Sequence, residues 1–242
     1  MTMAIREEHV ALVDAVRRFT ADRCPPRVVR AAIDGGRAGE RPPFWGELAS
    51  LGWLGLHLPE AVGGQGFGLL EQGLVLEGLG RAMAPGPMLP TVMASAVLHA
   101  AGGLPELITG LADGSLVGTV ALGPNDPVLC GAAADIVIVV TSHGSCVALT
   151  GDGFAAHPVE SLDPTRPLAA LEITGPGTPL AISAEQVRAI AATLAAAEAS
   201  GGAAWCVRTA ADHAAVREQF GRPIGQFQGV KHRCADMLVA AE

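Results

Sequence analysis

A long apolar segment that breaks sharply and restarts as a second helix is the feature that most constrains this fold. Ser183 can cap the segment, and Gln186, three residues later, completes a capping box. Gly201 and Gly202 each cost about 1 kcal/mol relative to alanine inside a helix, so we expect them to permit close packing. Apolar side chains recur at three- and four-residue spacing, which predicts one helix over 183–216, with an apolar face formed by Val187, Ile190, Leu194, Ala197 and Trp205.

The break is the tetrapeptide 220–223, Phe-Gly-Arg-Pro. Pro223 has no backbone N–H and biases Arg222 away from helical angles, so we expect a loop here. A second helix is predicted from Gln226, with an apolar face formed by Phe227, Val230, Cys234, Met237 and Leu238. The two helices form a hairpin whose corner carries Arg217, Arg222, Gln226 and Gln228.

Two guanidinium groups beside a helix N-terminus suit an anion such as a phosphate. Arginine binds phosphate through a planar fork, and the first turn of a helix offers free N–H donors. A solvated loop with two surface arginines is the simpler interpretation, and spacing alone does not exclude it.

The corner also carries a long motif. From Arg217 the chain reads Arg-x-x-Phe-Gly-x-x-Ile-x-x-Phe-Gln, and from Val230 it reads Val-Lys-His-x-x-Ala-Asp-Met. This resembles the signature hairpin of acyl-CoA dehydrogenases, in which the corner reaches into a neighbouring subunit and grips its FAD. The resemblance implies that Arg217 meets the FAD pyrophosphate. It further implies contacts along the phosphate, ribityl and adenine portions from Gln219, Phe220, Phe227 and Gln228.

A second match lies at 51–68, where a short apolar segment runs into Gly63-Gly64-Gln65-Gly66. By itself this stretch reads as a flexible turn, since no Gly-Lys-Ser/Thr follows it as in a phosphate-binding loop. It resembles the Leu-Gly-x-x-Gly-Leu-x-x-Pro-Glu-x-x-Gly-Gly-x-Gly stretch in the N-terminal helical domain of the same family.

The pattern along the chain predicts a mainly α protein with a small central β-domain. Helices are expected over 4–23, 43–51, 69–83, 91–100 and 104–113, and strands over 116–122, 136–140, 146–149 and 171–173. We expect an all-helical N-terminal domain over 1–115, a β-domain over 116–178 with a largely buried sheet, and the first helices of an incomplete C-terminal helical bundle over 179–242. Residues 176–179 are interpreted as a linker.

Two family features are missing. The middle domain is short, and its flavin motifs are replaced by the sequences at 120–126 and 134–140. The family's catalytic glutamate lies either beyond the end of this chain or near Ala191, which is no carboxylate. Glu198 is two turns from that register and is interpreted mainly as a solvated glutamate, while Glu218 is expected to form a local ion pair. No catalytic residue is assigned.

Composition excludes several classes of function. The net charge of −8 over 242 residues disfavours a nucleic-acid partner. There is no uninterrupted apolar run of 18 residues and no signal-peptide core, so we expect no membrane span and a cytoplasmic location. The five cysteines are scattered and odd in number, which supports neither a zinc site nor a disulfide framework.

The resemblance implies a subunit of an FAD-dependent acyl-CoA dehydrogenase that introduces an α,β double bond into an acyl-CoA thioester. It is similar to the shortened subunits of heteromeric enzymes, several of which act on steroid side chains. Expected partners are a second dehydrogenase subunit and an electron-transfer flavoprotein or similar acceptor. Two alternatives remain open: a structural subunit without flavin, and a relative with monooxygenase chemistry. The chain is either a fragment or a naturally short subunit, and its half-bundle should expose an apolar helix face, which predicts partner binding or instability.

Overall fold

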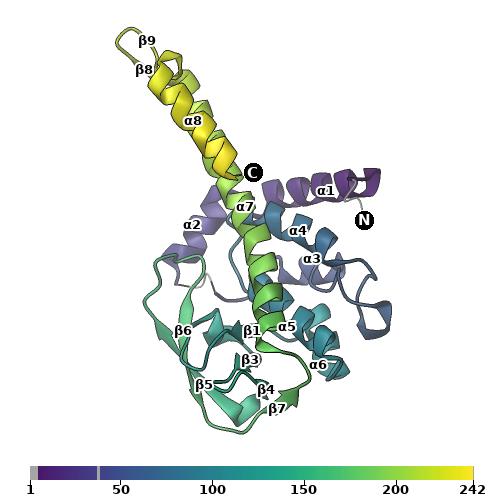
Figure 1. Ribbon diagram of the computed structural model, residues 1–242. Coiled ribbons are helices and arrows are strands. Elements are labelled where there is room, and N and C mark those ends of the chain that lie inside the picture. Colours follow the sequence, from purple (N-terminus) through teal and green to yellow (C-terminus); the bar gives the residue numbers. More distant parts are fainter. Residues whose placement is uncertain (1–4, 37–38, 242) are drawn as a thin grey trace.

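The computed structural model describes residues 5–36 and 39–241, and it divides into a helical body, a small β-region and a projecting arm (Figure 1). The body contains α1 (Glu7–Arg23), α2 (Pro26–Asp34), α3 (Trp45–Ser50), α4 (Leu69–Arg81), α5 (Met88–Ala101) and α6 (Pro105–Ala112). Five of these helices were predicted. Helix α2 was not, because two consecutive prolines, Pro25 and Pro26, are more typical of the end of a helix. Proline at the first helical position also starts a helix, since its missing N–H has no acceptor there anyway.

The buried faces of α1 and α4 do not follow hydrophobicity alone. Val10 is exposed, and α1 buries His9, Val16 and Thr20 instead. Leu70 of α4 and Met83, just after that helix, are also exposed. That helix buries Gln72, Val75, Leu76, Leu79 and Gly80, a register that includes a polar side chain and a glycine. Choosing the face by hydrophobicity alone misses such residues.

The β-region holds two sheets where one had been expected. The first sheet has the order β1-β3-β4-β7, built from Gly118–Ala121, Ile136–Val140, Cys146–Thr150 and Thr178–Leu180. The second has the order β2-β6-β5, built from Val128–Leu129, Leu168–Ile173 and Phe154–Val159. Strand β7 pairs with β4, so the predicted linker over 176–179 is wrong. The prolines and the glycine in 176–179 favour a loop, but β7 is an edge strand, where proline is tolerated.

Strand β3 is buried on both faces, as predicted for this sheet. Ile136, Ile138 and Val140 pack with the helices, while Val137 and Val139 pack toward the second sheet. Successive side chains of a strand point to opposite faces, so an uninterrupted run of β-branched residues suits a strand covered on both sides. This explains why the sequence shows no alternation here.

The long helix α7 (Ala184–Val216) begins as predicted. Ser183 Oγ accepts from Gln186 N, and Gln186 Oε1 accepts from Ser183 N. Its first half crosses α4 at two glycines. A Cβ on Gly201 would lie 1.9 Å from Glu77 O, and one on Gly80 would lie 2.1 Å from Glu198 O. The packing role predicted for Gly201 is therefore confirmed, whereas Gly202 meets only Gly80 O, at 4.0 Å.

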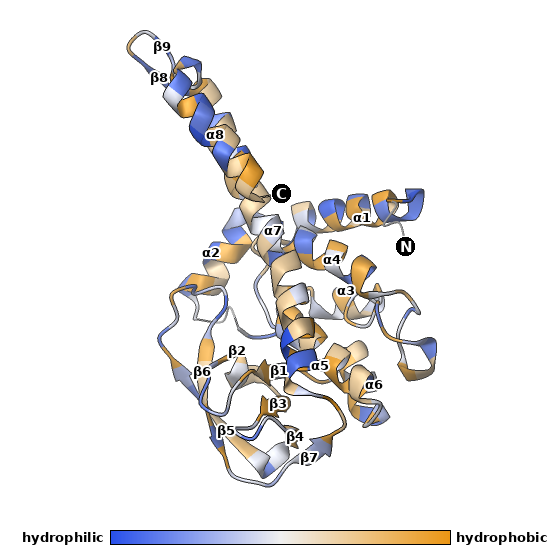
Figure 2. Cartoon of the chain, viewed as in Figure 1, coloured by the Kyte–Doolittle hydropathy of each residue, from blue (hydrophilic) through white to orange (hydrophobic). Residues whose placement is uncertain are grey.

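The second half of α7 leaves the body and pairs with α8 (Gln228–Ala241) to form the arm (Figure 1). Figure 2 shows apolar and polar residues mixed along this arm. Its exposed apolar side chains include Trp205, Val216, Leu238 and Val239. Within the described ranges, α7 alone is long and apolar enough to cross a membrane by length and composition. Its burial of Val187, Ala191 and Leu194 shows that its first half is a core helix.

The glycine-rich stretch 51–68 is a tightly packed turn. Gly63 and Gly66 have φ of 83° and 72°, and a Cβ on Gly64 would lie 2.0 Å from Leu58 O. Gly66 N donates to Leu58 O, and Phe67 N donates to Leu56 O. Backbone packing therefore requires glycine here. The interpretation as a flexible turn is wrong.

Candidate functional site: the corner of the arm

The corner between α7 and α8 is a miniature β-hairpin at the tip of the arm (Figure 1). Arg217 ends α7, with its N–H donating to His213 O at 2.8 Å and its carbonyl accepting from Ile224 N at 2.7 Å. Glu218–Gln219 then pairs with Arg222–Pro223. The two connecting residues have positive φ, 52° for Phe220 and 78° for Gly221. Such a turn matches the twist of the paired strands but is unfavourable for a residue with a side chain.

Helix α8 starts two residues later than predicted. A 3-10 turn, Ile224–Gln226, comes first and lies against α7, where a Cβ on Gly225 would be 2.8 Å from Ala214 O. Phe227 O then accepts from Val230 N and Lys231 N, which places Gln228 in the first turn of α8. Backbone N–H groups in a first turn have no helical acceptor and attract anions.

Aromatic and cationic side chains meet at this corner. The rings of Phe220 and Phe227 are 6.2 Å apart between centroids and nearly perpendicular. The Arg222 guanidinium carbon lies 4.2 Å from the Phe227 ring centroid, within range of a cation–π contact. Phe220 is nonetheless 92% exposed. A large apolar ring held in strained backbone and facing solvent is typical of a contact surface.

The predicted polar residues of the corner also face outward. Arg217, Gln219 and Gln228 are exposed. Within residues 5–36 and 39–241, no hydrogen bond or ion pair occupies their side chains. The ion pair expected for Glu218 is likewise absent from these ranges, so that expectation is wrong. The structure therefore brings the five predicted residues onto one tip and leaves their polar groups accessible.

The tip is positively charged in an acidic chain. Residues 217–233 contain Glu218 as their one carboxylate, against a total chain charge of −8, and their four fixed cations are Arg217, Arg222, Lys231 and Arg233. Clustered cations beside an open helix N-terminus attract phosphate groups. The perpendicular rings of Phe220 and Phe227 beside them add apolar contact area. The corner therefore offers cations and exposed aromatic side chains to an anionic ligand.

The chain offers no accessible base at the positions considered from sequence. Ala191 is buried in the helical core, packed with Leu194. Glu198 is also largely enclosed, and it forms an ion pair with Arg166. The interpretation of Glu198 as a solvated glutamate is wrong. Spacing could have shown this, because Glu198 continues the buried register of Val187, Ala191, Leu194 and Gly201.

The described part of the chain contains no group of three or more His, Cys, Asp or Glu side chains suited to a metal ion. Its five cysteines are free thiols. Burial raises the pKa of Cys24 to about 12 and the pKa of Cys130 to about 11, so both thiols stay protonated and unreactive at neutral pH.

Comparison with known proteins agrees with this architecture. Residues 6–104 match the acyl-CoA dehydrogenase N-terminal domain, and residues 184–242 match the acyl-CoA dehydrogenase C-terminal domain. The acyl-CoA dehydrogenase IpdE2 of Mycobacterium tuberculosis is 41% identical over 237 residues, which are 96% of this chain and 72% of that protein. This chain belongs to the acyl-CoA dehydrogenase family.

Two solved structures share the fold of this chain over nearly its whole length. The steroid acyl-CoA dehydrogenase Tcur3481-Tcur3483 superposes with a TM-score of 0.87 at 28% identity, covering 97% of this chain and 74% of that one. The ChsE4-ChsE5 complex from Mycobacterium tuberculosis gives a TM-score of 0.85 at 27% identity, covering 100% and 76%. The chain thus resembles chains of one steroid acyl-CoA dehydrogenase and of one two-component complex, and it spans about three quarters of their length.

Proposed function

We propose that this chain is a subunit of an FAD-dependent acyl-CoA dehydrogenase and that its arm completes a flavin site held mainly by a second subunit. The observation that carries the proposal is the accessible, positively charged aromatic corner at the tip of the arm. A cofactor bound within the chain's own body would not need these groups at its far end.

In this proposal Arg217 binds the pyrophosphate through its guanidinium fork, and the first turn of α8 adds N–H donors. Gln219 and Gln228 hydrogen-bond along the phosphate and ribityl portions, while Phe220 and Phe227 cover the adenine end. Bound FAD would supply the acceptor for the hydride that leaves the β-carbon of an acyl-CoA thioester as the α,β double bond forms. Within the described residues no base for the α-proton is assigned, because Ala191 carries no carboxylate and Glu198 is held by Arg166.

The substrate class and the electron acceptor belong to the same proposal. Of the two structures that the chain resembles, Tcur3481-Tcur3483 is a steroid acyl-CoA dehydrogenase and ChsE4-ChsE5 is a two-component complex. We propose a bulky steroid side-chain thioester as substrate, an electron-transfer flavoprotein or similar acceptor, and a cytoplasmic location. The domain division at 1–115, 116–178 and 179–242 is also part of the proposal, with the β-region extended by β7.

The test is the visible absorption spectrum of the purified chain, alone and after co-purification with a candidate partner dehydrogenase subunit. Flavin absorbance only in the mixture is the expected result. Arg217→Ala should then lower flavin occupancy about tenfold or more, because a charge-assisted phosphate contact is lost. Arg208→Ala, an exposed α7 position outside the corner, is the matched control and should leave occupancy unchanged.

Other outcomes assign other functions. Flavin bound by the chain alone would mean that it holds its own cofactor, as a homo-oligomer. Flavin in neither sample, with a stable complex between the chains, would favour the structural subunit that binds no flavin. If product formation requires oxygen incorporation, the monooxygenase alternative applies.

A further inference from the structure

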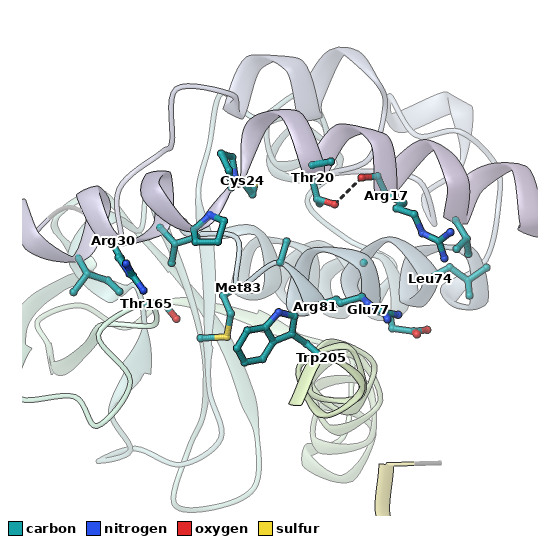
Figure 3. Close-up of a pocket in the computed structure, with 18 residues that line it drawn as sticks. Arg17, Thr20, Cys24, Arg30, Leu74, Glu77, Arg81, Met83, Thr165 and Trp205 are labelled. Carbon is teal, nitrogen blue, oxygen red and sulfur yellow. Dashed lines mark hydrogen bonds between the residues drawn. The ribbon is translucent and has the colours of Figure 1, made fainter. Parts of the chain in front are cut away.

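A cavity of about 540 Å³ lies between α1, α2, α4 and the middle of α7 (Figure 3). None of its lining residues belongs to the corner of the arm. Its walls are mainly apolar and include Val13, Cys24, Val29, Ile33 and Leu74. Trp205 of α7 and Met83 lie side by side at one edge of the cavity, and both are more than 40% exposed. The volume is in the range that holds small organic ligands, which is about 300–1,000 Å³.

The polar groups of this cavity are mainly cationic. Arg17, Arg30 and Arg81 line it, with Glu77 as the one carboxylate. Within the described ranges, Arg30 and Arg81 form no ion pair, and Arg17 has only a 3.8 Å contact with Asp14 at the surface. Thr20 lines the wall but already donates to Arg17 O, so it needs no ligand. An excess of positive charge at the edge of an apolar hollow, in a chain of charge −8, favours an anionic amphiphile.

We propose that this cavity binds a small amphiphile with an apolar body and one carboxylate or similar anionic head. The body lies between α1, α2 and α4 against Trp205, and the head meets one of the arginines, which are spread along the edge of the cavity (Figure 3). The site is separate from the corner of the arm, and it does not rest on the proposed flavin function. Size and charge together favour this occupant. A neutral lipid would form no ion pair with the arginines. A free inorganic anion would leave the apolar walls exposed to water.

The test uses the full chain with decanoate and with decanol, which share an apolar tail and differ in head group. Binding is measured by calorimetry and by tryptophan fluorescence, with Trp205→Phe identifying the signal of that residue. Trp45 and Trp53 are buried in the core, so Trp205 should dominate any shift. Decanoate should move its emission to shorter wavelength, and decanol should bind about tenfold or more weakly without the charge-assisted contact.

Matched variants locate the site. Ala21→Trp places a large ring into the cavity from an exposed position of α1 and should abolish decanoate binding, while Ala11→Trp, exposed on α1 outside the cavity, should not. Arg30→Gln or Arg81→Gln should weaken binding severalfold, and Arg27→Gln and Arg18→Gln, which lie outside the cavity, should have no effect. Arg30 is exposed and Arg81 is half-buried, so the glutamine variants test the site even if Ala21→Trp fails to fold.

Three results would overturn the proposal. Equal binding of decanoate and decanol would remove the role of the arginines. Unchanged binding in Ala21→Trp would place the ligand elsewhere. Failure of decanoate to bind, together with hydrogen-exchange protection of α1 and α2 only when a partner subunit is added, would assign the cavity to a protein interface.

Discussion

Arg166 and Glu198 form a bidentate ion pair that joins the β-region to the long helix. Arg166 Nη2 donates to Glu198 Oε1 at 2.7 Å, and its Nε donates to Oε2 at 3.3 Å. Arg166 Nη1 also donates to the carbonyl of Ala84, just after α4. Burial acts to lower the pKa of Arg166, but Glu198 outweighs this and raises it, so the pair stays charged. One side chain thus connects the β-region, α4 and α7.

Arg166→Met should destabilise the fold by about 3–5 kcal/mol, because it leaves Glu198 enclosed without its partner. Chemical denaturation with urea measures this. The double variant Arg166→Met with Glu198→Leu should recover much of the loss, since replacing both members of a buried pair by apolar groups is often neutral. Arg18→Met, at an exposed position of α1, is the control. A loss below about 1 kcal/mol in Arg166→Met would mean that water reaches Glu198.

The two neighbouring glycines of α7 should respond oppositely to alanine. Gly201→Ala places a methyl group against Glu77 O and Arg81 N, so it should destabilise the protein by about 2 kcal/mol or more. Gly202→Ala meets only Gly80 O at 4.0 Å and should be neutral or stabilising by up to about 1 kcal/mol. Thermal unfolding of both variants distinguishes them, and similar shifts in both would contradict the crossing geometry.

Stability should fall with acid because of His57. Burial lowers the pKa of His57 to about 4. The hydrogen bond that His57 Nδ1 donates to Gln72 Oε1 acts to raise this pKa, and the charge of His99 lowers it further. The unfolded chain binds this proton at a pKa near 6.5, so it holds more protons than the folded chain between about pH 4 and 6.5. The contribution of His57 is therefore complete above about pH 6.5, and up to about 3 kcal/mol is lost as the pH falls to about 4.

Denaturation at pH 7 and pH 4.5 measures the loss, and the NMR titration of His57 should have its midpoint near pH 4. His143→Asn, an exposed position, should keep the full pH dependence. Glu71, whose pKa is lowered by backbone and His9 hydrogen bonds against the effect of burial, adds a loss of the same sign only at still lower pH. A midpoint near 6.5 would mean that His57 is solvated.

Phe220 should matter to binding more than to folding. Its φ of 52° costs about 1 kcal/mol or more for a residue with a side chain, which glycine avoids. Phe220→Gly should therefore keep or slightly raise the unfolding free energy, while lowering flavin occupancy of the complex with the partner subunit. The control is Val239→Ala, which removes an exposed apolar side chain elsewhere on the arm. Alanine is chosen because glycine would destabilise helix α8 itself. Full flavin occupancy in Phe220→Gly would remove the ring from the proposed site.

The sequence predicts much of this fold for physical reasons that differ between elements. The cap of α7 depends on Ser183 and Gln186 alone, and local chemistry is readable from sequence. Strand β7 and the ion pair of Arg166 depend on contacts with residues far along the chain, so no local pattern indicates them. At the corner, motif similarity supplied the five residues. The positive φ of Phe220 and its perpendicular packing with Phe227 required coordinates.

The crossing of α4 and α7 at Gly201 sets the direction in which the arm projects. Arg217, at the corner, lies 16 residues further along the helix, or about 24 Å at 1.5 Å per residue. A tilt of α7 by about 5° at Gly201 would move the corner sideways by about 2 Å, which is enough to break a hydrogen bond between a guanidinium and a phosphate. The position of the Arg217 guanidinium therefore depends as much on the absence of a Cβ at Gly201 as on the residues around Arg217.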